Sequence, residues 1–255
     1  MADDPVTVET GDVATVTVDR PDAMNALNTA VLEGLLDAFE RLRGDCRVVV
    51  LTGAGEDAFV AGADIAYMQD LSVPEAQVYG ELGHEVTRVI EQFPAPVIAA
   101  VNGYAFGGGC ELALAADMRV ASSNAVIGQP EIDLGIVPGW GGTQRLSRIV
   151  GDATARRMVF FGERLDAEDA MHEGLVGEVV APGELEEYVR DMAEDLAAKP
   201  AFALQAAKEA LNQVHESHLA AGLAYERRLW SGMFGTADQR EGMSAFVENR
   251  DPDFE

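Results

Sequence analysis

Two glutamates, Glu111 and Glu131, stand in settings that favour acid–base chemistry. Glu111 closes the glycine-rich run at 107–111, and Glu131 ends the stretch 129–131, ahead of a second glycine-rich run at 138–142. Two carboxyl groups that lie close together can hold one proton between them, so that one serves as a base and the other as an acid. Glycines beside such groups can present bare backbone N–H groups to a developing oxyanion. The pattern predicts acid–base catalysis supported by backbone hydrogen bonds.

Each of these residues also has a purely structural interpretation. A carboxylate such as Glu111 in the first turn of a helix is stabilised by the helix macrodipole without any catalytic role. Glu131 could be an ordinary loop carboxylate, and the run at 138–142 could be a flexible turn. Cys110 has no histidine near it in the sequence to act as a base, so we interpret it as a small residue that packs a helix. The catalytic interpretation rests on the two glutamates and the glycines together.

Other kinds of site that glycines and cysteines can indicate are not supported by their spacing. The chain lacks a Gly-x-x-x-x-Gly-Lys-Ser/Thr motif, the glycines at 107–109 lack Gly-x-Gly-x-x-Gly spacing, and no Gly-x-Ser-x-Gly nucleophile turn occurs. Cys46 and Cys110 are far apart, and the four histidines are scattered without a carboxylate cluster beside them. We therefore expect no disulfide, no metal site and no separate cofactor.

The chain is strongly acidic along its whole length. It carries 44 aspartates and glutamates against 18 lysines and arginines, a formal net charge of −26, and its lysines are Lys199 and Lys208. This charge opposes binding to nucleic acid or to anionic membranes, and no apolar run approaches the length of a membrane helix. A dispersed acidic surface tolerates its self-repulsion when salt screens it, so we expect a high-salt cytoplasm, that of a halophilic archaeon. Residues 1–4 lack the apolar stretch of a secretory signal, which also favours a cytoplasmic enzyme.

The order of secondary structure predicts an α/β core followed by helices. With 255 residues the chain can form one large domain, or one domain with an appendage. Strand, turn and helix patterns follow one another repeatedly, which is typical of parallel strands, and beyond about residue 183 the pattern is helical. The expected strands are 6–8, 13–18, 47–52, 97–101, 119–122 and 125–128, with a loop at 59–64 and a turn at 102–105; the expected helices are 30–42, 65–71, 74–93, 108–116, 185–198, 201–214 and 218–234.

Three stretches in a fixed order resemble one enzyme family. They are Ala61-Gly62-Ala63-Asp64-Ile65, the run 96–112 that ends in Gly107-Gly108-Gly109-Cys110-Glu111-Leu112, and the run 128–146 that begins Gly128-Gln129-Pro130-Glu131. They are similar to the enoyl-CoA hydratase/isomerase (crotonase) superfamily, and most to its hydratases. The resemblance implies a crotonase-like spiral of ββα units over residues 1–190 that holds the active site, and a C-terminal helical trimerisation region over 191–255. It also implies a homotrimer, or a homohexamer built as a dimer of trimers.

The resemblance further implies roles for individual residues. The backbone N–H groups of Ala63 and Gly108 would form an oxyanion hole for the thioester carbonyl. Glu111 would activate water and Glu131 would deliver a proton in the reversible syn addition of water to a trans-2-enoyl-CoA, giving a 3-hydroxyacyl-CoA. Coenzyme A would enter as part of the substrate, with its adenine near 59–63 and the acyl chain near Met68 and Phe106. The implied CoA-binding residues are Phe59, Ala61, Ala63, Asp64, Ile65 and Gly108.

The family includes other reactions, so alternatives stay open. A Δ3,Δ2-enoyl-CoA isomerase would use Glu131 alone, other acyl-CoA enzymes share the fold, and a non-catalytic CoA-binding protein would bind acyl-CoA without turnover. Retention of both glutamates favours hydration. Trp140 lies in a Pro-Gly-x-Gly-Gly loop where many hydratases carry a small residue, and we interpret it as a packed aromatic plug, which leaves the acyl chain length open. Arg240 and Arg250 stand where lysines would be expected to meet the CoA phosphates.

Overall fold

Two β-sheets form the centre of the molecule. The computed structural model describes residues 4–254. The expected absence of a secretory signal rests partly on residues 1–3, which lie outside this range. Within that range a six-stranded sheet has the order β1-β2-β3-β5-β7-β10, and a four-stranded sheet has the order β4-β6-β8-β9. The larger sheet contains β1 (Val6–Glu9), β2 (Val13–Val18), β3 (Val48–Gly53), β5 (Val97–Val101), β7 (Met118–Ser122) and β10 (Glu178–Val180); the smaller contains β4 (Ala58–Val60), β6 (Tyr104–Phe106), β8 (Val126–Gly128) and β9 (Arg164–Asp166).

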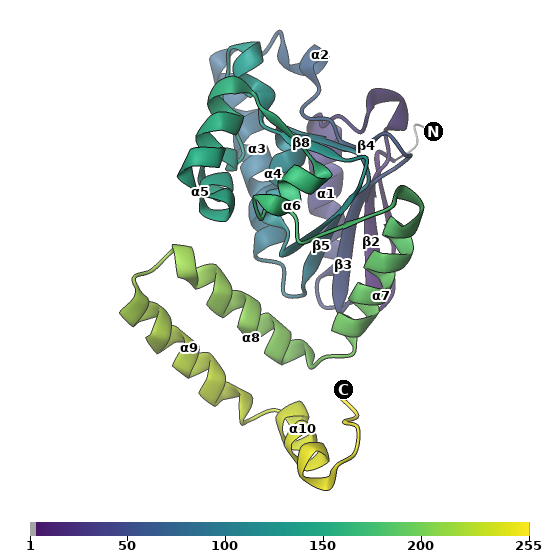
Figure 1. Ribbon diagram of the computed structural model, residues 1–255, viewed down its shortest axis with the longest axis vertical. Helices are drawn as coiled ribbons and strands as arrows, with labels where there is room; N and C mark the ends of the chain where they lie inside the picture. The colour runs from purple at the N-terminus through teal and green to yellow at the C-terminus, as the bar shows by residue number, and fades with distance from the viewer. Residues whose placement is uncertain (1–3, 255) are drawn as a thin grey trace.

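Helices cover the sheets and continue beyond them. Figure 1 shows that α8, α9 and α10 lie apart from the body that contains the sheets, while α1 to α7 surround it. No helix within residues 4–254 has both the length and the apolar character needed to cross a membrane. The helices are α1 (Thr29–Leu42), α2 (Ile65–Met68), α3 (Val73–Glu91), α4 (Gly108–Ala115), α5 (Gly142–Phe161), α6 (Ala167–His172), α7 (Leu185–Ala197), α8 (Ala201–Asn212), α9 (Leu219–Met233) and α10 (Ala237–Glu248).

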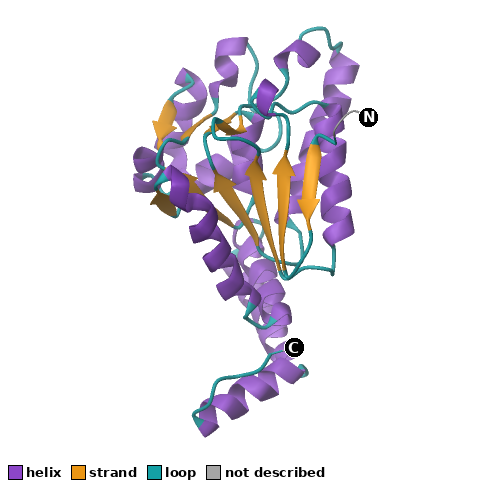
Figure 2. Ribbon diagram, turned by 90° about the vertical axis from the view of Figure 1, so that its right-hand side faces the viewer, coloured by secondary structure: helices purple, strands orange, loops and turns teal. Residues whose placement is uncertain are grey.

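The larger sheet is mainly parallel and is covered on both faces. The strands β2, β3, β5, β7 and β10 pair in parallel, and β1 joins β2 as an antiparallel hairpin. Every residue of β5 is buried, as expected for a parallel strand between two layers of helices, seen in Figure 2 on either side of the strands. On β3, Leu51 packs into the cluster that contains α1 and α3, whereas Val50 packs into the cluster that contains α7. The predicted α/β class with parallel strands is confirmed.

Two local predictions were wrong. The expected loop at 59–64 begins inside β4, and the expected turn at 102–105 contains the start of β6. These strands have three residues each and pair with one another in parallel, so they are too short to show the alternation that identifies a strand. The pattern also gave no sign of α5, which is kinked at Gly151, where φ is 78° and ψ is 166°.

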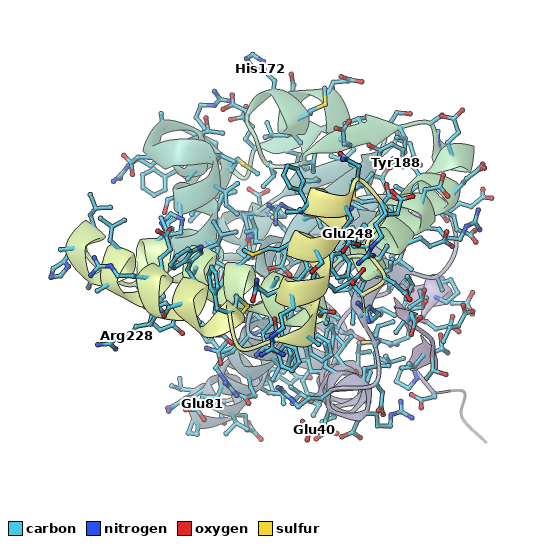
Figure 3. The ribbon with its side chains drawn as sticks, turned by 90° about the horizontal axis from the view of Figure 1, so that it is seen from below. Glu40, Glu81, His172, Tyr188, Arg228 and Glu248 are labelled. Carbon is cyan, nitrogen blue, oxygen red and sulfur yellow. The ribbon has the colours of Figure 1, made fainter. Side chains whose placement is uncertain are left out.

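A buried lysine is one of the contacts between the C-terminal helices and the core. Lys208 on α8 is 7% exposed, and its Nζ lies 2.7 Å from Oδ2 of Asp117 and donates to the carbonyl oxygens of Ile90 and Ala95. Position 190, the expected domain boundary, falls within α7, which packs on the sheet; the assembly role of 191–255 stays a prediction. Figure 3 views this region from below, with α9 and α10 in front of the core.

Candidate active site

One cavity brings the predicted catalytic residues together. Glu111, Glu131, Ala63 and Gly108 all line it, although they come from three different segments of the chain. Its volume is about 460 Å³, within the usual range for small-molecule sites. The wall is formed by the segment after β4, the start of α4, the 3₁₀ turn Pro130–Leu134, the loop before α5, and one side of α2 and α3.

Close backbone approaches explain the glycines at 107–109. Gly107, directly before α4, has φ of 50°, a conformation that favours glycine. A Cβ on Gly109 would lie 1.9 Å from the carbonyl oxygen of Val60, so α4 packs directly on β4. A Cβ on Gly107 would lie 3.1 Å from Oε1 of Glu131. Without side chains at these positions, the start of α4 can lie against both the strand and the second glutamate.

Glu111 is held by backbone N–H groups of the loop before α5. It lies in the first turn of α4, and its residue is 2% exposed. Its Oε1 accepts hydrogen bonds from the N–H groups of Trp140 and Gly142, both at 2.7 Å. A Cβ on Gly142 would approach this oxygen to 2.9 Å. Burial raises the pKa of the Glu111 carboxyl, and these N–H groups and the nearby Arg145 oppose part of that rise.

Glu131 lines the same cavity in a different environment. Its residue is 8% exposed, and burial raises the pKa of its carboxyl to about 7, with a further contribution from the negative charge of Glu111. The amide of Gln129 is fully buried beside it and, with its nitrogen turned toward Glu131, donates to both carboxyl oxygens at 2.8 and 3.1 Å. The two glutamates thus differ in their partners, which is the condition for different protonation states.

Two backbone N–H groups of residues that line the cavity have no hydrogen-bond acceptor among residues 4–254. Leu27 and Ala63 form an isolated parallel bridge, whose bonds run from Leu27 N to Gly62 O and from Asp64 N to Leu27 O. This leaves the N–H of Ala63 without an acceptor among residues 4–254. Gly108 is the first residue of α4, so its N–H has no partner within the helix. Both groups can donate to a carbonyl oxygen placed in the cavity, and the positive end of α4 adds to its stabilisation.

Comparisons with known proteins identify the family of this chain. The family model described as enoyl-CoA hydratase/isomerase matches residues 9–255. The chain belongs to the enoyl-CoA hydratase/isomerase family. It is 44% identical over 242 residues to the short-chain-enoyl-CoA hydratase of Clostridium acetobutylicum, covering 94% of this chain and 93% of that protein. It is 45% identical over 244 residues to the crotonyl-CoA hydratase of Syntrophomonas wolfei, covering 95% of this chain and 94% of that protein.

A solved structure of the enoyl-CoA hydratase/isomerase family shares the fold. The crystal structure of an enoyl-CoA hydratase from Bacillus anthracis matches with a TM-score of 0.94 at 38% identity, over 98% of each chain. The predicted crotonase-like fold with its C-terminal helical region is therefore confirmed.

Some of the other residues implied to bind CoA line the cavity, and others do not. Ala61 and Ile65 line the cavity, as do Met68 and Phe106, which were expected beside the acyl chain. The side chain of Phe59 is completely buried in the core and does not line it.

The carboxylate of Asp64 serves the local structure. It accepts from the N–H of Tyr67 at 3.3 Å, capping α2, and forms an ion pair with Arg20 at 3.3 Å. Arg250, expected near the CoA phosphates, is paired with Glu241 and Glu248. Both side chains thus already have charged or backbone partners within the chain.

Sequence reasoning missed several residues that shape the site. Arg145 donates to the carbonyl oxygen of Trp140 at 3.0 Å and pairs with Glu91 at 2.8 Å, so it steadies the loop whose N–H groups hold Glu111. Gly80 and Gly83 lie on the inner side of α3. Glycines inside a helix at i, i+3 spacing are a signal of close packing that the sequence did contain.

Proposed function

We propose that this chain is an enoyl-CoA hydratase that adds water reversibly to a trans-2-enoyl-CoA and yields a 3-hydroxyacyl-CoA. The observation that carries the proposal is the pair of buried carboxyl groups in one cavity, with Glu111 fixed by two N–H donors and Glu131 kept at a raised pKa. The hydratase names of relatives at 44% and 45% identity support the same reaction. Coenzyme A arrives with the substrate, and the reaction needs no separate cofactor.

In this mechanism the shared proton resides on Glu131. The N–H groups of Trp140 and Gly142 stabilise negative charge on Glu111, whereas the charge of Glu111 makes ionisation of Glu131 less favourable. Glu111 as carboxylate orients a water molecule and removes its proton as the oxygen attacks the β-carbon. Glu131 then delivers its proton to the α-carbon. In the proposed reaction both carboxyl groups would act on the same face of the double bond, which gives syn addition.

The oxyanion hole stabilises the charge that attack creates. When the hydroxide oxygen bonds to the β-carbon, the electrons move to the thioester oxygen and form an enolate. The N–H groups of Ala63 and Gly108 would donate to that oxygen, and such donors stabilise the transition state more than the ground state. Loss of one such donor commonly costs about 3 kcal/mol of barrier.

The decisive experiment compares two reactions in four proteins. Hydration of crotonyl-CoA in molar KCl is measured for the wild type, Glu111→Gln and Glu131→Gln, with Glu33→Gln on the exposed face of α1 as a control for the lost charge. We expect each site variant to lose about 10²-fold or more in turnover and the control to keep it. Conversion of a 3-enoyl-CoA is measured in parallel. An isomerase would keep that conversion in Glu111→Gln, because it uses Glu131 alone; a wild type that binds acyl-CoA without turnover would be a binding protein.

We also propose the setting in which the enzyme works. The net charge of −26 favours a high-salt cytoplasm such as that of a halophilic archaeon. Large apolar side chains are exposed on the C-terminal helices, including Trp230 (64%) and Phe246 (85%), which favours association with further subunits. The family resemblance implies that this assembly is a homotrimer or a dimer of trimers. The mass of the particle in molar KCl tests the assembly.

A further inference from the structure

The active-site cavity has an open end and a closed end. At one end the apolar side chains are exposed: Ile65 is 47%, Leu134 54% and Val137 65% accessible. At the other end the wall is buried, since Trp140 is 4% and Tyr79 is 6% accessible. A substrate attached to the large CoA group must enter through the open end. The acyl chain beyond the reacting carbons therefore points toward the closed end.

The indole of Trp140 forms that closed end and is tightly seated. A Cβ on Gly83 of α3 would lie 2.1 Å from the indole, and a Cβ on Gly108 would lie 2.3 Å from it. The ring therefore occupies the space that side chains at both glycines would fill. Tyr79 packs edge-on against the indole at 5.3 Å between ring centroids, and its hydroxyl donates to the carbonyl oxygen of Leu27 at 2.7 Å. The end wall is held in place from three sides.

Gly80, one turn away on the same helix, meets the opposite situation. It lines the cavity, and a Cβ built on it meets no atom within 4 Å. Helix α3 thus presents one glycine that is covered by the indole and one that leaves space for the ligand. A side chain added at Gly83 would collide with the indole, whereas a side chain added at Gly80 would occupy cavity space.

We propose that Trp140 limits this enzyme to short acyl chains, and that Gly80 provides the width in which such a chain lies. The proposal rests on the hydratase function proposed above and names the substrate class for the same site. Because a hydrophobic pocket discriminates by roughly 10- to 200-fold for each methylene group that it cannot hold, a fixed indole at its end is sufficient to exclude medium chains.

The test measures kcat/KM for crotonyl-CoA, trans-2-hexenoyl-CoA and trans-2-decenoyl-CoA in molar KCl. The wild type should prefer crotonyl-CoA over decenoyl-CoA by at least about tenfold. In Trp140→Ala the ratio of decenoyl to crotonyl activity should rise by about tenfold or more, since the substitution removes the end wall while its backbone N–H can still reach Glu111. In Gly80→Leu the ratio of hexenoyl to crotonyl activity should fall by a similar factor.

Gly80→Leu also keeps the proposal testable if Trp140→Ala does not fold. Its side chain enters open space, and leucine is a better helix former than glycine. Trp140→Phe provides a milder shortening of the end wall, for which we expect a smaller rise in the decenoyl ratio. Gly80→Ala, which adds one methyl group to the same place, should lie between the wild type and Gly80→Leu.

The outcomes separate the two proposals. If the wild type hydrates none of the three substrates, the proposed hydratase function is wrong. If it hydrates crotonyl-CoA and decenoyl-CoA equally well, or if the ratios do not change in folded Trp140 and Gly80 variants, the hydratase function stands and the role of Trp140 is wrong.

Discussion

The spiral core and the three C-terminal helices bury their side chains to very different degrees. All eight residues of α4, which carries Glu111, are buried, whereas α9 has no buried residue among its fifteen. The core completes its packing within one chain. The helices α8 to α10 instead present large apolar side chains to solvent, as is typical of surfaces that another subunit covers. We therefore expect catalysis and assembly to respond to different substitutions, with Lys208 as a buried contact between the two regions.

The largest effect is expected from breaking that contact. Lys208→Met would leave the half-buried carboxylate of Asp117 without its ion partner, and we expect the free energy of unfolding to fall by about 3 kcal/mol. Denaturant unfolding in molar KCl measures this. Lys199, the only other lysine, is exposed. The control variant Lys199→Met should therefore change the free energy of unfolding by less than about 0.5 kcal/mol. If Asp117→Asn added to Lys208→Met restores part of the lost stability, the unpaired charge of Asp117 is the cause of the loss. If Lys208→Met and Lys199→Met are equally stable, the predicted role of Lys208 is wrong.

The next effect concerns the protonation of Glu131 in the core. Its carboxyl has a pKa of about 7 in the folded protein against an ordinary value of 4.5, so the native state retains a proton that the unfolded chain has lost. Its contribution to stability is therefore fully present at low pH and is lost as the pH rises through about 7. Relative to the wild type, Glu131→Gln should gain stability between pH 5 and 8, by up to about 3 kcal/mol. The free energy of unfolding of the control Glu33→Gln should depend on pH in the same way as that of the wild type. If Glu131→Gln also shows the wild-type pH dependence, Glu131 is ionised in the native wild-type protein.

The hydration rate should follow the same group. Because Glu131 supplies the proton, kcat of the wild type should fall as the pH rises above about 7. A rate that stays constant up to pH 9 would remove Glu131 from the acid role.

A smaller effect is expected at the helical region. Phe246→Ser on α10 removes an apolar side chain that is 85% exposed in the single chain, and we expect it to weaken subunit association by about 2 kcal/mol, as for a central interface residue. Sedimentation at several protein concentrations measures this, with Arg228→Gln on α9 as the control. The core should keep its fold, seen as an unchanged circular dichroism spectrum. A particle mass equal to that of the wild type at all concentrations would mean that this face is not covered by a second copy.

For any single pair of charges, the smallest effect on stability is expected from a change in salt concentration. A pair of exposed charges contributes about 1 kcal/mol or less, but the screening length falls from about 30 Å at 0.01 M to about 3 Å at 1 M salt. The free energy of unfolding should therefore rise with KCl because the repulsion of the acidic surface is spread over the whole chain. Unfolding in KCl and in an equally concentrated sucrose solution separates screening from solvent exclusion; stability that is constant in KCl would contradict the high-salt assignment.

Much of this structure could be read from the sequence, and the limits of that reading are physical. The apolar run at 97–101 predicted a buried strand, and the glycines at 107–109 predicted a helix start that carries Glu111. Distances between segments are not encoded in spacing, so the approach of Gly109 to Val60 and the bonds from Trp140 and Gly142 to Glu111 could not be foreseen. The roles of Ala63 and Gly108 came from resemblance, because an unpaired N–H group leaves no mark on residue type.

Trp140 combines two tasks that can be separated by protein engineering. Its main-chain N–H orients Glu111, while its side chain closes the acyl pocket. Every amino acid except proline supplies the same N–H group. A saturation library at this single codon should therefore return active enzymes with graded chain-length preference, with the proline variant as the one expected to lose the contact to the base. Natural relatives could have changed their substrates at this position without rebuilding their catalytic centre.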